Sequence, residues 1–294
     1  MSSYRGRLAP SPTGYLHLGH ARTFLIAAER AKQAQGILIF RNEDLDPDRC
    51  RPEFAIAMLD DLHWLGIEWQ EGPDCGGPCA PYLQSERRQE YLEVWAKLRD
   101  RGFIYPCTCS RKDLAQSATI PNDTDDEPIY SGKCRWRTDA SKFENPAGVN
   151  WRFRVPDGEQ ITFVDQNFGP QAYVAGRDFG DFVIWRRDDV PAYQLAVVAD
   201  DHAMKITEVV RGTDLLKSTA RQLLIYRALG WDPPAFYHCE LMRDETGIRL
   251  AKRHDSLSIH SLREDGCSPA DVRNRTLYSI HIGMPFHGRG TVAD

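Results

Sequence analysis

The chain has 294 residues, a net charge of −5 and a pI near 6.0, with 41% hydrophobic and 27% charged residues. This composition gives a globular protein enough apolar surface for a core, and it excludes a globally basic nucleic-acid-binding protein. The sequence has no apolar run near the length of a membrane span, and its first residues lack the apolar stretch of an export signal. We therefore expect a cytoplasmic protein with no membrane partner, whose eight cysteines serve as metal ligands before they form disulfides.

The N-terminal part of the chain alternates short apolar runs with amphipathic segments, as a doubly wound parallel α/β sheet does. Buried strands are expected at residues 5–8 and 37–40, because these runs are brief and apolar. Helices are expected at residues 20–35, closed by Gly36, at residues 52–66, and at residues 87–101.

The middle of the chain has a different pattern. It contains paired cysteines, an Asp-rich polar stretch at residues 121–128, and two short apolar runs at residues 151–155 and 161–165. We expect the two runs to pair as antiparallel strands, and the whole segment to form a small insertion.

The α/β pattern then returns. Apolar segments at residues 182–186, 193–199 and 206–210 are expected to be extended, followed by a helix at residues 213–229 and a strand at residues 236–242. The predicted plan has residues 1–102 as the first half of an α/β domain, 103–180 as the insertion, 181–240 as the second half and 241–294 as a short C-terminal segment.

The strongest motif is the loop between the first strand and the first helix, Pro-Ser-Pro-Thr-Gly-Tyr-Leu-His-Leu-Gly-His at residues 10–20. Ligands bind at the carboxyl end of parallel strands, and the N–H groups at the start of a following helix attract phosphate. Gly19 lets the backbone approach a nucleotide, while His17 and His20 can donate hydrogen bonds to a phosphate that gains charge during displacement. The loop therefore predicts a nucleotide site.

This loop resembles the HIGH motif of class I aminoacyl-tRNA synthetases, and residues 7–14, Arg-Leu-Ala-Pro-Ser-Pro-Thr-Gly, resemble the glutamyl branch of that family. Residues 41–46, 193–202 and 206–214 also resemble the family, and the similarity extends from residue 5 to about residue 255. The resemblance implies a Rossmann-like catalytic domain, with a zinc site and an acceptor-binding region in the insertion.

The resemblance also implies which residues bind L-glutamate. Arg7 and Arg211 would bind carboxylate, and Glu43 would receive the α-ammonium group, as the charges of the substrate require. Ser11 and Tyr193 would add hydroxyl contacts. The full implied set is Arg7, Leu8, Ala9, Pro10, Ser11, Glu43, Tyr193 and Arg211.

A second nucleotide motif follows the last expected strand. Residues 249–253, Arg-Leu-Ala-Lys-Arg, resemble the KMSKS loop, and Lys252 matches the lysine that steadies the pyrophosphate leaving group. Arg249 and Ala251 depart from the family pattern, so we expect slowed activation rather than none. The implied ATP-binding set is His17, Gly19, His20 and Lys252, of which His17, His20 and Lys252 would be catalytic, with Mg²⁺ accompanying ATP.

A Cys-x-Cys pair and a third, later cysteine provide three thiolates, and zinc prefers four tetrahedral ligands. The region resembles that of the short glutamyl-Q enzymes, in which a tyrosine is the fourth ligand, and this implies one structural Zn²⁺ per chain. The implied set is Cys107, Cys109, Tyr130 and Cys134. Unligated thiols in a small core are the alternative, and Cys75 and Cys79 are a competing source of ligands.

Only about 40 residues follow Lys252, which leaves no room for the helical region that reads the anticodon in bacterial-type glutamyl-tRNA synthetases. This layout resembles the glutamyl-Q tRNA(Asp) synthetases. It implies activation of L-glutamate to glutamyl-adenylate without tRNA, then transfer to the queuosine base at the wobble position of tRNA(Asp), by a monomer. The alternatives are a truncated enzyme charging tRNA(Glu), a non-catalytic tRNA-binding paralogue, and a nucleotidyltransferase that needs no glutamate.

Overall fold

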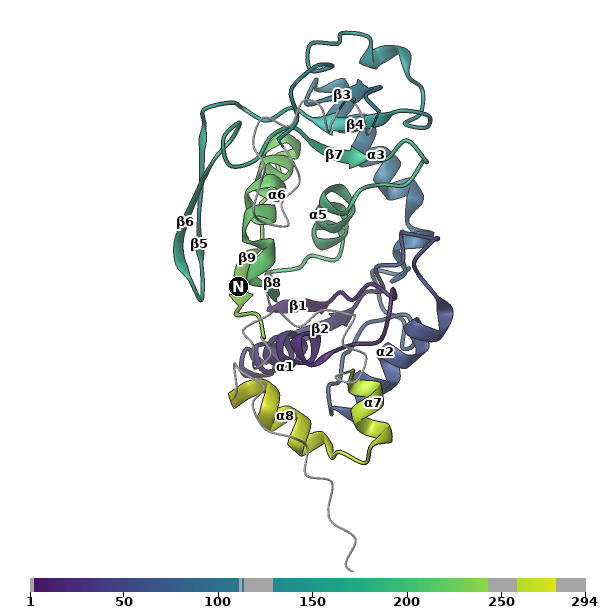
Figure 1. The fold of residues 1–294 in the computed structure, drawn as a ribbon, viewed down its shortest axis with the longest axis vertical. Coiled ribbons are helices and arrows are strands. Elements are labelled where there is room, and N and C mark those ends of the chain that lie inside the picture. The colour runs from purple at the N-terminus through teal and green to yellow at the C-terminus, as the bar shows by residue number, and fades with distance from the viewer. Residues whose placement is uncertain (1–2, 111–112, 114–128, 243–257, 279–294) are drawn as a thin grey trace, which may run out of the picture. The chain divides into compact units, whose positions relative to one another are not determined.

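A parallel pair of strands joined by a helix begins the fold. β1 (Arg5–Leu8) pairs with β2 (Ile37–Phe40) in register from Arg5↔Ile37 to Leu8↔Phe40, and α1 (Leu18–Gln33) connects them (Figure 1). Both strands have the predicted bounds. Their interior positions are buried, as expected for short, continuously apolar strands in a parallel arrangement.

The computed structural model describes residues 3–110, 113, 129–242 and 258–278. The chain divides into two compact units, the first of Met1–Glu86, Ile206–Asp214 and Tyr237–Asp294, the second of Arg87–Lys205 and Leu215–Phe236. Besides β1, α1 and β2, the first unit contains α2 (Pro52–Trp64), η1 (Gln84–Glu86), β8 (Glu208–Gly212), α7 (Ile259–Glu264) and α8 (Pro269–Tyr278). β9 (Ala235–Cys239) runs from the second unit into the first, where it lies next to β8.

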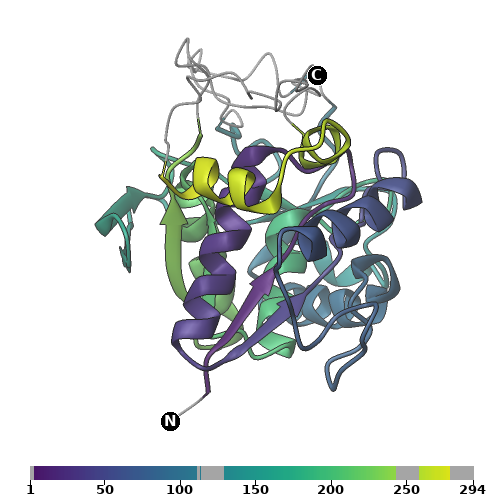
Figure 2. The ribbon, with the colours of Figure 1, turned by 90° about the horizontal axis from the view of Figure 1, so that it is seen from below.

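Segments far apart in the sequence close the first unit. β8 runs beside β1, where Thr207 N donates to the carbonyl oxygen of Arg5 at 2.9 Å. The buried carboxylate of Glu208 accepts from Tyr4 Oη at 2.8 Å and from Arg30 Nε at 2.6 Å. α8 packs across α1 (Figure 2). The contacts of Glu208 and Thr207 therefore join segments from both predicted halves of the α/β domain in one unit.

The second unit combines helices with antiparallel strands. A three-stranded sheet has the order β3-β4-β7, and β5 pairs antiparallel with β6. Its elements are α3 (Arg88–Asp100), β3 (Ile104–Cys107), η2 (Ala140–Lys142), β4 (Asn150–Phe153), β5 (Gln160–Asp165), β6 (Gly169–Val174), β7 (Phe182–Trp185), α5 (Tyr193–Ala203) and α6 (Leu216–Leu229). The short turn η3 (Thr213–Leu215) begins in the first unit and ends at the start of α6. Among the described residues, no helix combines the length and the apolar character needed to cross a lipid bilayer.

Two sequence predictions for this unit are wrong. Residues 193–199 were expected to be extended, but they form most of α5. α5 packs against α3, α6 and β7, so that residues 195–201 are all buried and show no amphipathic period. The runs at 151–155 and 161–165 do not pair with each other, because β4 lies between β3 and β7 while β5 pairs with β6.

The predicted end of the first helix is also corrected. Gln35, with φ of 51°, adopts the left-handed conformation that was expected at Gly36. Gly36 is needed for space instead, because a Cβ atom there would lie 2.5 Å from the carbonyl oxygen of Tyr4. The glycine therefore allows the chain to enter β2 close beside β1.

A buried charged cluster fixes α3 to α5 in the second unit. The carboxylate of Asp200 accepts from Arg87 Nε at 2.7 Å and from Tyr91 Oη at 2.9 Å. All three side chains are buried. Because the carboxylate is both paired and hydrogen-bonded, its desolvation is compensated only while these donors are present.

Candidate active site and metal centre

The loop predicted to bind nucleotide enters α1 through a cap made of two histidines. His17 is the N-cap residue, and its Nδ1 accepts from the backbone N–H of Gly19 at 3.0 Å. His20 Nδ1 accepts from the backbone N–H of His17 at 3.3 Å, and the two rings stack with their centroids 3.8 Å apart. A Cβ atom at Gly19 would lie 2.9 Å from the His17 ring, so the cap requires glycine there. Because both Nδ1 atoms accept, each neutral ring carries its proton on Nε2 and presents a donor at the positive end of α1.

Two buried arginines lie at neighbouring strand positions in the first unit. Arg7, in β1, donates from Nη1 to the carbonyl oxygen of Val210 at 2.8 Å. Arg211 follows Val210 directly in β8, and both arginines are almost fully buried. The two residues that were predicted to bind carboxylate therefore lie in β1 and β8, and the Arg7 side chain contacts the residue before Arg211.

A histidine that the sequence analysis missed orients Arg211. His238, in β9, is fully buried, and its Nε2 accepts from Arg211 Nε at 3.1 Å. Accepting this bond requires a neutral imidazole, and the bond gives the planar guanidinium group one fixed direction. The surrounding Phe-Tyr-His-Cys sequence gives no signal beyond a buried polar position in a strand.

The carboxylate predicted to receive the ammonium group follows β2. The backbone N–H of Glu43 donates to the carbonyl oxygen of Pro10 at 2.9 Å, which ties this segment to the loop after β1. Its side chain, which is buried, accepts from Arg41 Nη2 at 2.9 Å. Asp44, the next residue, accepts from the backbone and hydroxyl of Ser85 at 2.9 and 2.7 Å. These contacts place Glu43 beside the segment that holds Ser11.

The other predicted site residues are distributed differently. Leu8, Ala9, Pro10 and Ser11 end β1 and begin the loop. Tyr193 is the first residue of α5 in the second unit. Arg249, Ala251 and Lys252 lie outside the described residues. The functional roles of all these residues stay predictions.

The four predicted metal ligands form a cluster in the second unit. The hydroxyl of Tyr130 lies 3.4 Å from Cys107 Sγ and 3.3 Å from Cys109 Sγ, and the sulfurs of Cys109 and Cys134 are 3.6 Å apart. The three sulfurs all lie within 4.8 Å of one another. The cluster has its own small core with Tyr105, so the thiols and the phenol face one point.

The spacing of these atoms fits a tetrahedral zinc ion. With Zn–S bonds of about 2.3 Å and a Zn–O bond of about 2.0 Å, a tetrahedron has S···S edges of roughly 3.8 Å and S···O edges of roughly 3.5 Å. The Cys109–Cys134 and Tyr130 distances lie close to these values. Soft thiolates favour zinc over hard divalent cations, so this donor set can hold one zinc ion.

The thiols and the phenol differ in how readily they lose a proton. Burial opposes ionisation of Cys134, but hydrogen bonds from Thr108, Tyr130 and Cys109 outweigh it and lower the pKa of its thiol to about 7. Burial raises the pKa of Cys109 to about 11. Burial and the hydrogen bonds to the cysteine sulfurs raise the pKa of Tyr130 well above its usual value. A metal ion therefore has to displace the Tyr130 proton, whereas Cys134 is partly ionised at neutral pH.

Comparison with known proteins places the chain in a family. The family described as tRNA synthetases class I (E and Q), catalytic domain, matches residues 3–289. The chain belongs to this synthetase family. The predicted fold class, an α/β class I synthetase domain, is thereby confirmed, and the family resemblance inferred from the loop motifs is confirmed with it.

Relatives of this synthetase carry two kinds of name. The protein named Glutamyl-Q tRNA(Asp) synthetase from Nitratidesulfovibrio vulgaris is 50% identical over 274 residues, covering 91% of the chain and 83% of the relative. That from Symbiobacterium thermophilum is 47% identical over 277 residues, covering 93% and 85%. Glutamate--tRNA ligase 2 from Acidithiobacillus ferrooxidans is 42% identical over 289 residues, covering 97% of the chain and 59% of the relative.

Solved structures of glutamyl-tRNA synthetases share the fold. The enzyme from Elizabethkingia anophelis superposes with a TM-score of 0.81 at 30% identity. A glutamate tRNA ligase from Elizabethkingia meningosepticum, in complex with its amino acid, superposes with a TM-score of 0.79 at 30% identity. In both comparisons 94% of the chain is covered, and the synthetase spans 61% of the solved chain.

The competing cysteine pair does not join the metal cluster. Among the described residues, the group of thiols, histidines and carboxylates close enough to share an ion is the one at Cys107, Cys109 and Cys134. Cys75 lies on an exposed loop, and Cys79 is half-buried near Arg5. Within the described part of the chain, Cys75 and Cys79 do not belong to a group of three or more side chains that could share an ion.

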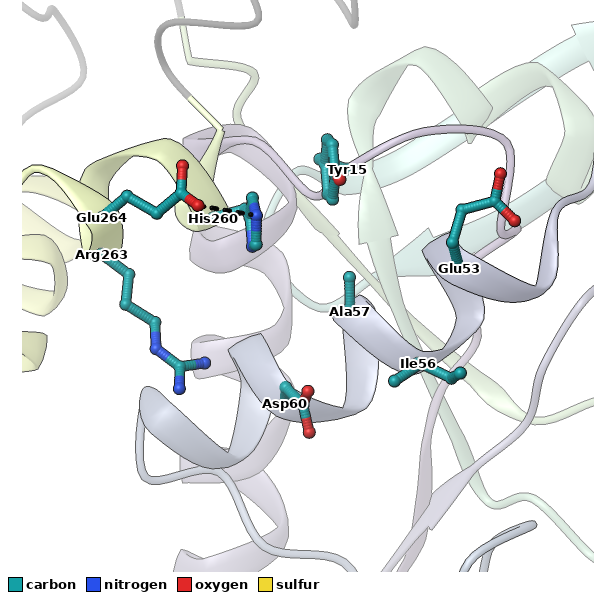
Figure 3. A pocket seen from close by; sticks show the side chains of 8 residues that line it. All are labelled: Tyr15, Glu53, Ile56, Ala57, Asp60, His260, Arg263 and Glu264. Carbon is teal, nitrogen blue, oxygen red and sulfur yellow. Dashed lines mark ion pairs between the residues drawn. The ribbon is translucent and has the colours of Figure 1, made fainter.

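A pocket of about 500 Å³ lies beside the nucleotide loop in the first unit, between α2 and α7 (Figure 3). Its wall is formed by Tyr15, Glu53, Ile56, Ala57, Asp60, His260, Arg263 and Glu264. The Tyr15 ring stacks on the His260 ring at a centroid distance of 4.5 Å. The backbone N–H of Ile259 donates to the carbonyl oxygen of Leu16 at 2.7 Å. The start of α7 is therefore fixed to the loop that carries His17.

Asp61, in α2, is a buried carboxyl group that the sequence analysis did not single out. It is fully buried, and neither of its oxygens has a hydrogen-bond partner among the described residues. Burial raises the pKa of Asp61 to about 6, although the positive charges of His260 and Arg263 act in the opposite direction. The Asp61 carboxyl group, which has no hydrogen-bond partner among the described residues, is therefore close enough to α7 to feel the charges of His260 and Arg263.

Proposed function

We propose that this synthetase activates L-glutamate with ATP, in the absence of tRNA, and transfers it to the queuosine base at the wobble position of tRNA(Asp). The observation that carries the proposal is that Arg7 hydrogen-bonds to the strand of Arg211, while Glu43 hydrogen-bonds to the loop that runs from β1 to His17 and His20. A dicarboxylic amino acid with an ammonium group needs this combination of charges. The relatives named Glutamyl-Q tRNA(Asp) synthetase, at 50% and 47% identity, support this acceptor.

In the first step, the side chains hold the substrate for attack. Arg211, held by His238, and Arg7, held by the Val210 carbonyl, bind the carboxylates of glutamate, while Glu43 binds the ammonium group. Fixing the amino acid beside the triphosphate removes translational freedom and aligns the reacting atoms. This pre-organisation is the main contribution that the strand-end residues make to the reaction.

Activation is an in-line displacement at the α-phosphorus of ATP. A carboxylate oxygen of glutamate forms the new P–O bond, the bond to the β-phosphate breaks, and pyrophosphate leaves. The Nε2–H groups of His17 and His20 stabilise the charge that develops on the phosphate oxygens, and Lys252 is proposed to do so on the leaving group. Mg²⁺ bound with ATP would supply further neutralisation of the phosphates.

In the second step, a hydroxyl of the queuosine cyclopentenediol attacks the carbonyl carbon of the mixed anhydride. The ester bond forms, the acyl–phosphate bond breaks, AMP leaves with the electron pair, and the hydroxyl proton is released to solvent. Unpaired anticodon-loop bases can be splayed out and read one at a time, which suits such an acceptor. The zinc ion has no role in either step and would hold the cysteine segments together.

The test of activation is glutamate-dependent ATP–pyrophosphate exchange without tRNA. We expect exchange with glutamate and none with glutamine or aspartate. Arg211→Gln should lower exchange by about 10- to 100-fold, the size of a lost charged hydrogen bond, whereas Arg227→Gln, at an exposed ion pair with Glu159, should leave it unchanged. Absence of exchange in the parent protein would support a non-catalytic paralogue.

The test of the acceptor compares purified tRNAs. Transfer of labelled glutamate to tRNA(Asp) with queuosine, but not to tRNA(Asp) without it, is the expected result. The relatives named glutamate--tRNA ligase motivate the second candidate function, charging of tRNA(Glu). Transfer to tRNA(Glu) in place of queuosine-containing tRNA(Asp) would favour that function.

A further inference from the structure

A second pocket, of about 530 Å³, borders the cysteine cluster in the second unit. It is lined by residues 129–132, 135–136, 157–158, 174–177 and 180–181. The activation chemistry proposed above uses side chains of the first unit, so this pocket has no role in that step. Its most unusual feature is the side chain of Trp136, which is 80% exposed. A side chain this large is normally well buried, so its exposure beside a pocket indicates a surface that contacts something else.

The turn that carries Trp136 is fixed on both sides. Cys134, two residues earlier, belongs to the cluster, and its carbonyl oxygen accepts from the backbone N–H of Arg137 at 3.2 Å. Arg135, between them, is held by the carboxylate of Asp181 and by the carbonyl oxygen of Val155 at 2.5 Å. The indole is thus displayed on a rigid turn, and its surface costs little entropy to use for binding.

A second part of the pocket wall is formed by residues 174–177 and 180–181. Gly176 and Gly180 contribute backbone without side chains, and a Cβ atom at Gly180 would lie 2.9 Å from Ile129. Arg177 is 72% exposed and, in the part of the chain that the structure describes, pairs with the adjacent carboxylate of Asp178 at 3.0 Å. An exposed pair of this kind exchanges easily for another anion. The wall therefore offers a guanidinium group to a phosphate.

The charges of the pocket discriminate between possible ligands. Arg135 pairs with Asp181 and also, at 3.2 Å, with Asp157, whose carboxylate stays 60% exposed, and the remaining lining charge is Arg177. A pocket with this balance does not select a bare polyanion, but it suits a ring that stacks, donates N–H groups to Asp157 and carries one phosphate. The segment that contributes Trp136 to the pocket, Lys-Cys-Arg-Trp-Arg at residues 133–137, alternates basic residues with the aromatic one, a pattern typical of single-stranded nucleic-acid sites.

We propose that this pocket binds an unpaired nucleobase of the acceptor tRNA, stacked on Trp136 with its phosphate at Arg177. The proposal rests on the proposed function, since it assigns the second unit a share in holding the tRNA loop. Stacking on an aromatic platform tolerates different bases, so the pocket contributes affinity and position, while the identity of the accepting base is read elsewhere.

The experiment compares Trp136→Ala and Trp136→Phe with Phe168→Ala in the full chain. Phe168 is a matched control because it is an aromatic residue of the same unit and is 38% exposed. The readouts are the affinity for a labelled anticodon stem–loop of tRNA(Asp), the KM for tRNA in transfer, exchange without tRNA, and zinc content. Because affinity is measured directly, the pocket is tested even if transfer fails.

We expect Trp136→Ala to weaken RNA binding and raise the KM for tRNA by about 5- to 100-fold, the range for one base–aromatic stack. Trp136→Phe should retain most of the affinity, Phe168→Ala all of it, and exchange and zinc content should not change. Equal RNA affinity in Trp136→Ala and Phe168→Ala would overturn the proposal. Loss of exchange or of zinc together with RNA affinity would show a structural role for Trp136 and would also overturn it. If the proposed function itself is wrong, this is seen separately, because the parent protein then shows no glutamate-dependent exchange.

Discussion

Replacing Asp61 by asparagine should stabilise the protein at neutral pH, by an amount that falls as the pH is lowered. The carboxyl group is fully buried with no hydrogen-bond partner among the described residues, and its pKa is raised from 3.8 to about 6. The folded state therefore holds a proton that the unfolded state releases at lower pH. Ionisation of the buried group is an energetic penalty that asparagine, which is neutral at every pH, does not carry.

The sign and size of the effect follow from linkage. Between about pH 4 and pH 6 the unfolded chain ionises first, so the stability of the parent protein falls as the pH rises, and above pH 6 the full penalty persists. A difference of about 2 units, at 1.36 kcal/mol per unit, gives a penalty of roughly 3 kcal/mol. Only part of it has developed at about pH 5, so the stability difference between variant and parent should grow by about 1.4 kcal/mol from pH 5 to pH 8.

The assay is urea unfolding of the parent protein and Asp61→Asn at several pH values in that range. Groups that titrate in both proteins cancel in the difference, and Asp60→Asn, which changes an exposed neighbour on α2, provides the matched control. We expect no trend with pH for the control. A stability difference for Asp61→Asn that is the same at pH 5 and pH 8 would refute the reasoning, because it would show that the buried carboxyl titrates as in the unfolded chain.

Three further changes test other parts of the structure. Cys134→Ser should reduce bound zinc, measured by metal analysis, and lower the melting temperature, while chelator treatment of the parent protein should have the same effect; unchanged zinc would exclude Cys134 as a ligand. Arg87→Met leaves the Asp200 carboxylate buried without its cation and should cost about 3–5 kcal/mol in chemical unfolding, whereas adding Asp200→Asn should restore part of this loss. His238→Leu removes the acceptor that orients Arg211 and should raise the KM for glutamate in exchange by about 10- to 100-fold without changing the KM for ATP. An equal rise in both KM values would contradict an orienting role.

The elements that the sequence predicted well are those with a local signal. β1 and β2 have their predicted bounds, and Gly230, with φ of 72°, closes α6 as expected. The helix at residues 193–203 was not predicted, because a segment that is buried on all sides has neither the helical nor the strand period. Strand partners depend on contacts between distant residues, and for this reason β4 and β5 were assigned to the wrong pairing.

In the candidate site, too, the features with a local sequence signal were predicted and those that depend on distant contacts were missed. The loop with His17 and His20 was recognisable because its spacing is rare and its place after a strand is informative. His238 was missed because its importance comes from a contact with Arg211, which lies in a different strand. Trp136 was missed because its exposure cannot be read from its neighbours in the sequence. Long-range geometry thus explains both omissions.

The chain passes from the first unit to the second and back twice, and this affects how the protein is made. Residues 87–205 and 215–236 are both inserted between segments of the first unit. Tyr4 and Arg30 close on Glu208 only after separations of 204 and 178 residues. At typical synthesis rates of about 5–20 residues per second, β1 waits on the order of 10–40 s on the ribosome for its neighbour β8. An N-terminal sheet edge that stays open during translation is a natural substrate for chaperones, and neither unit can be obtained by simple truncation of the gene.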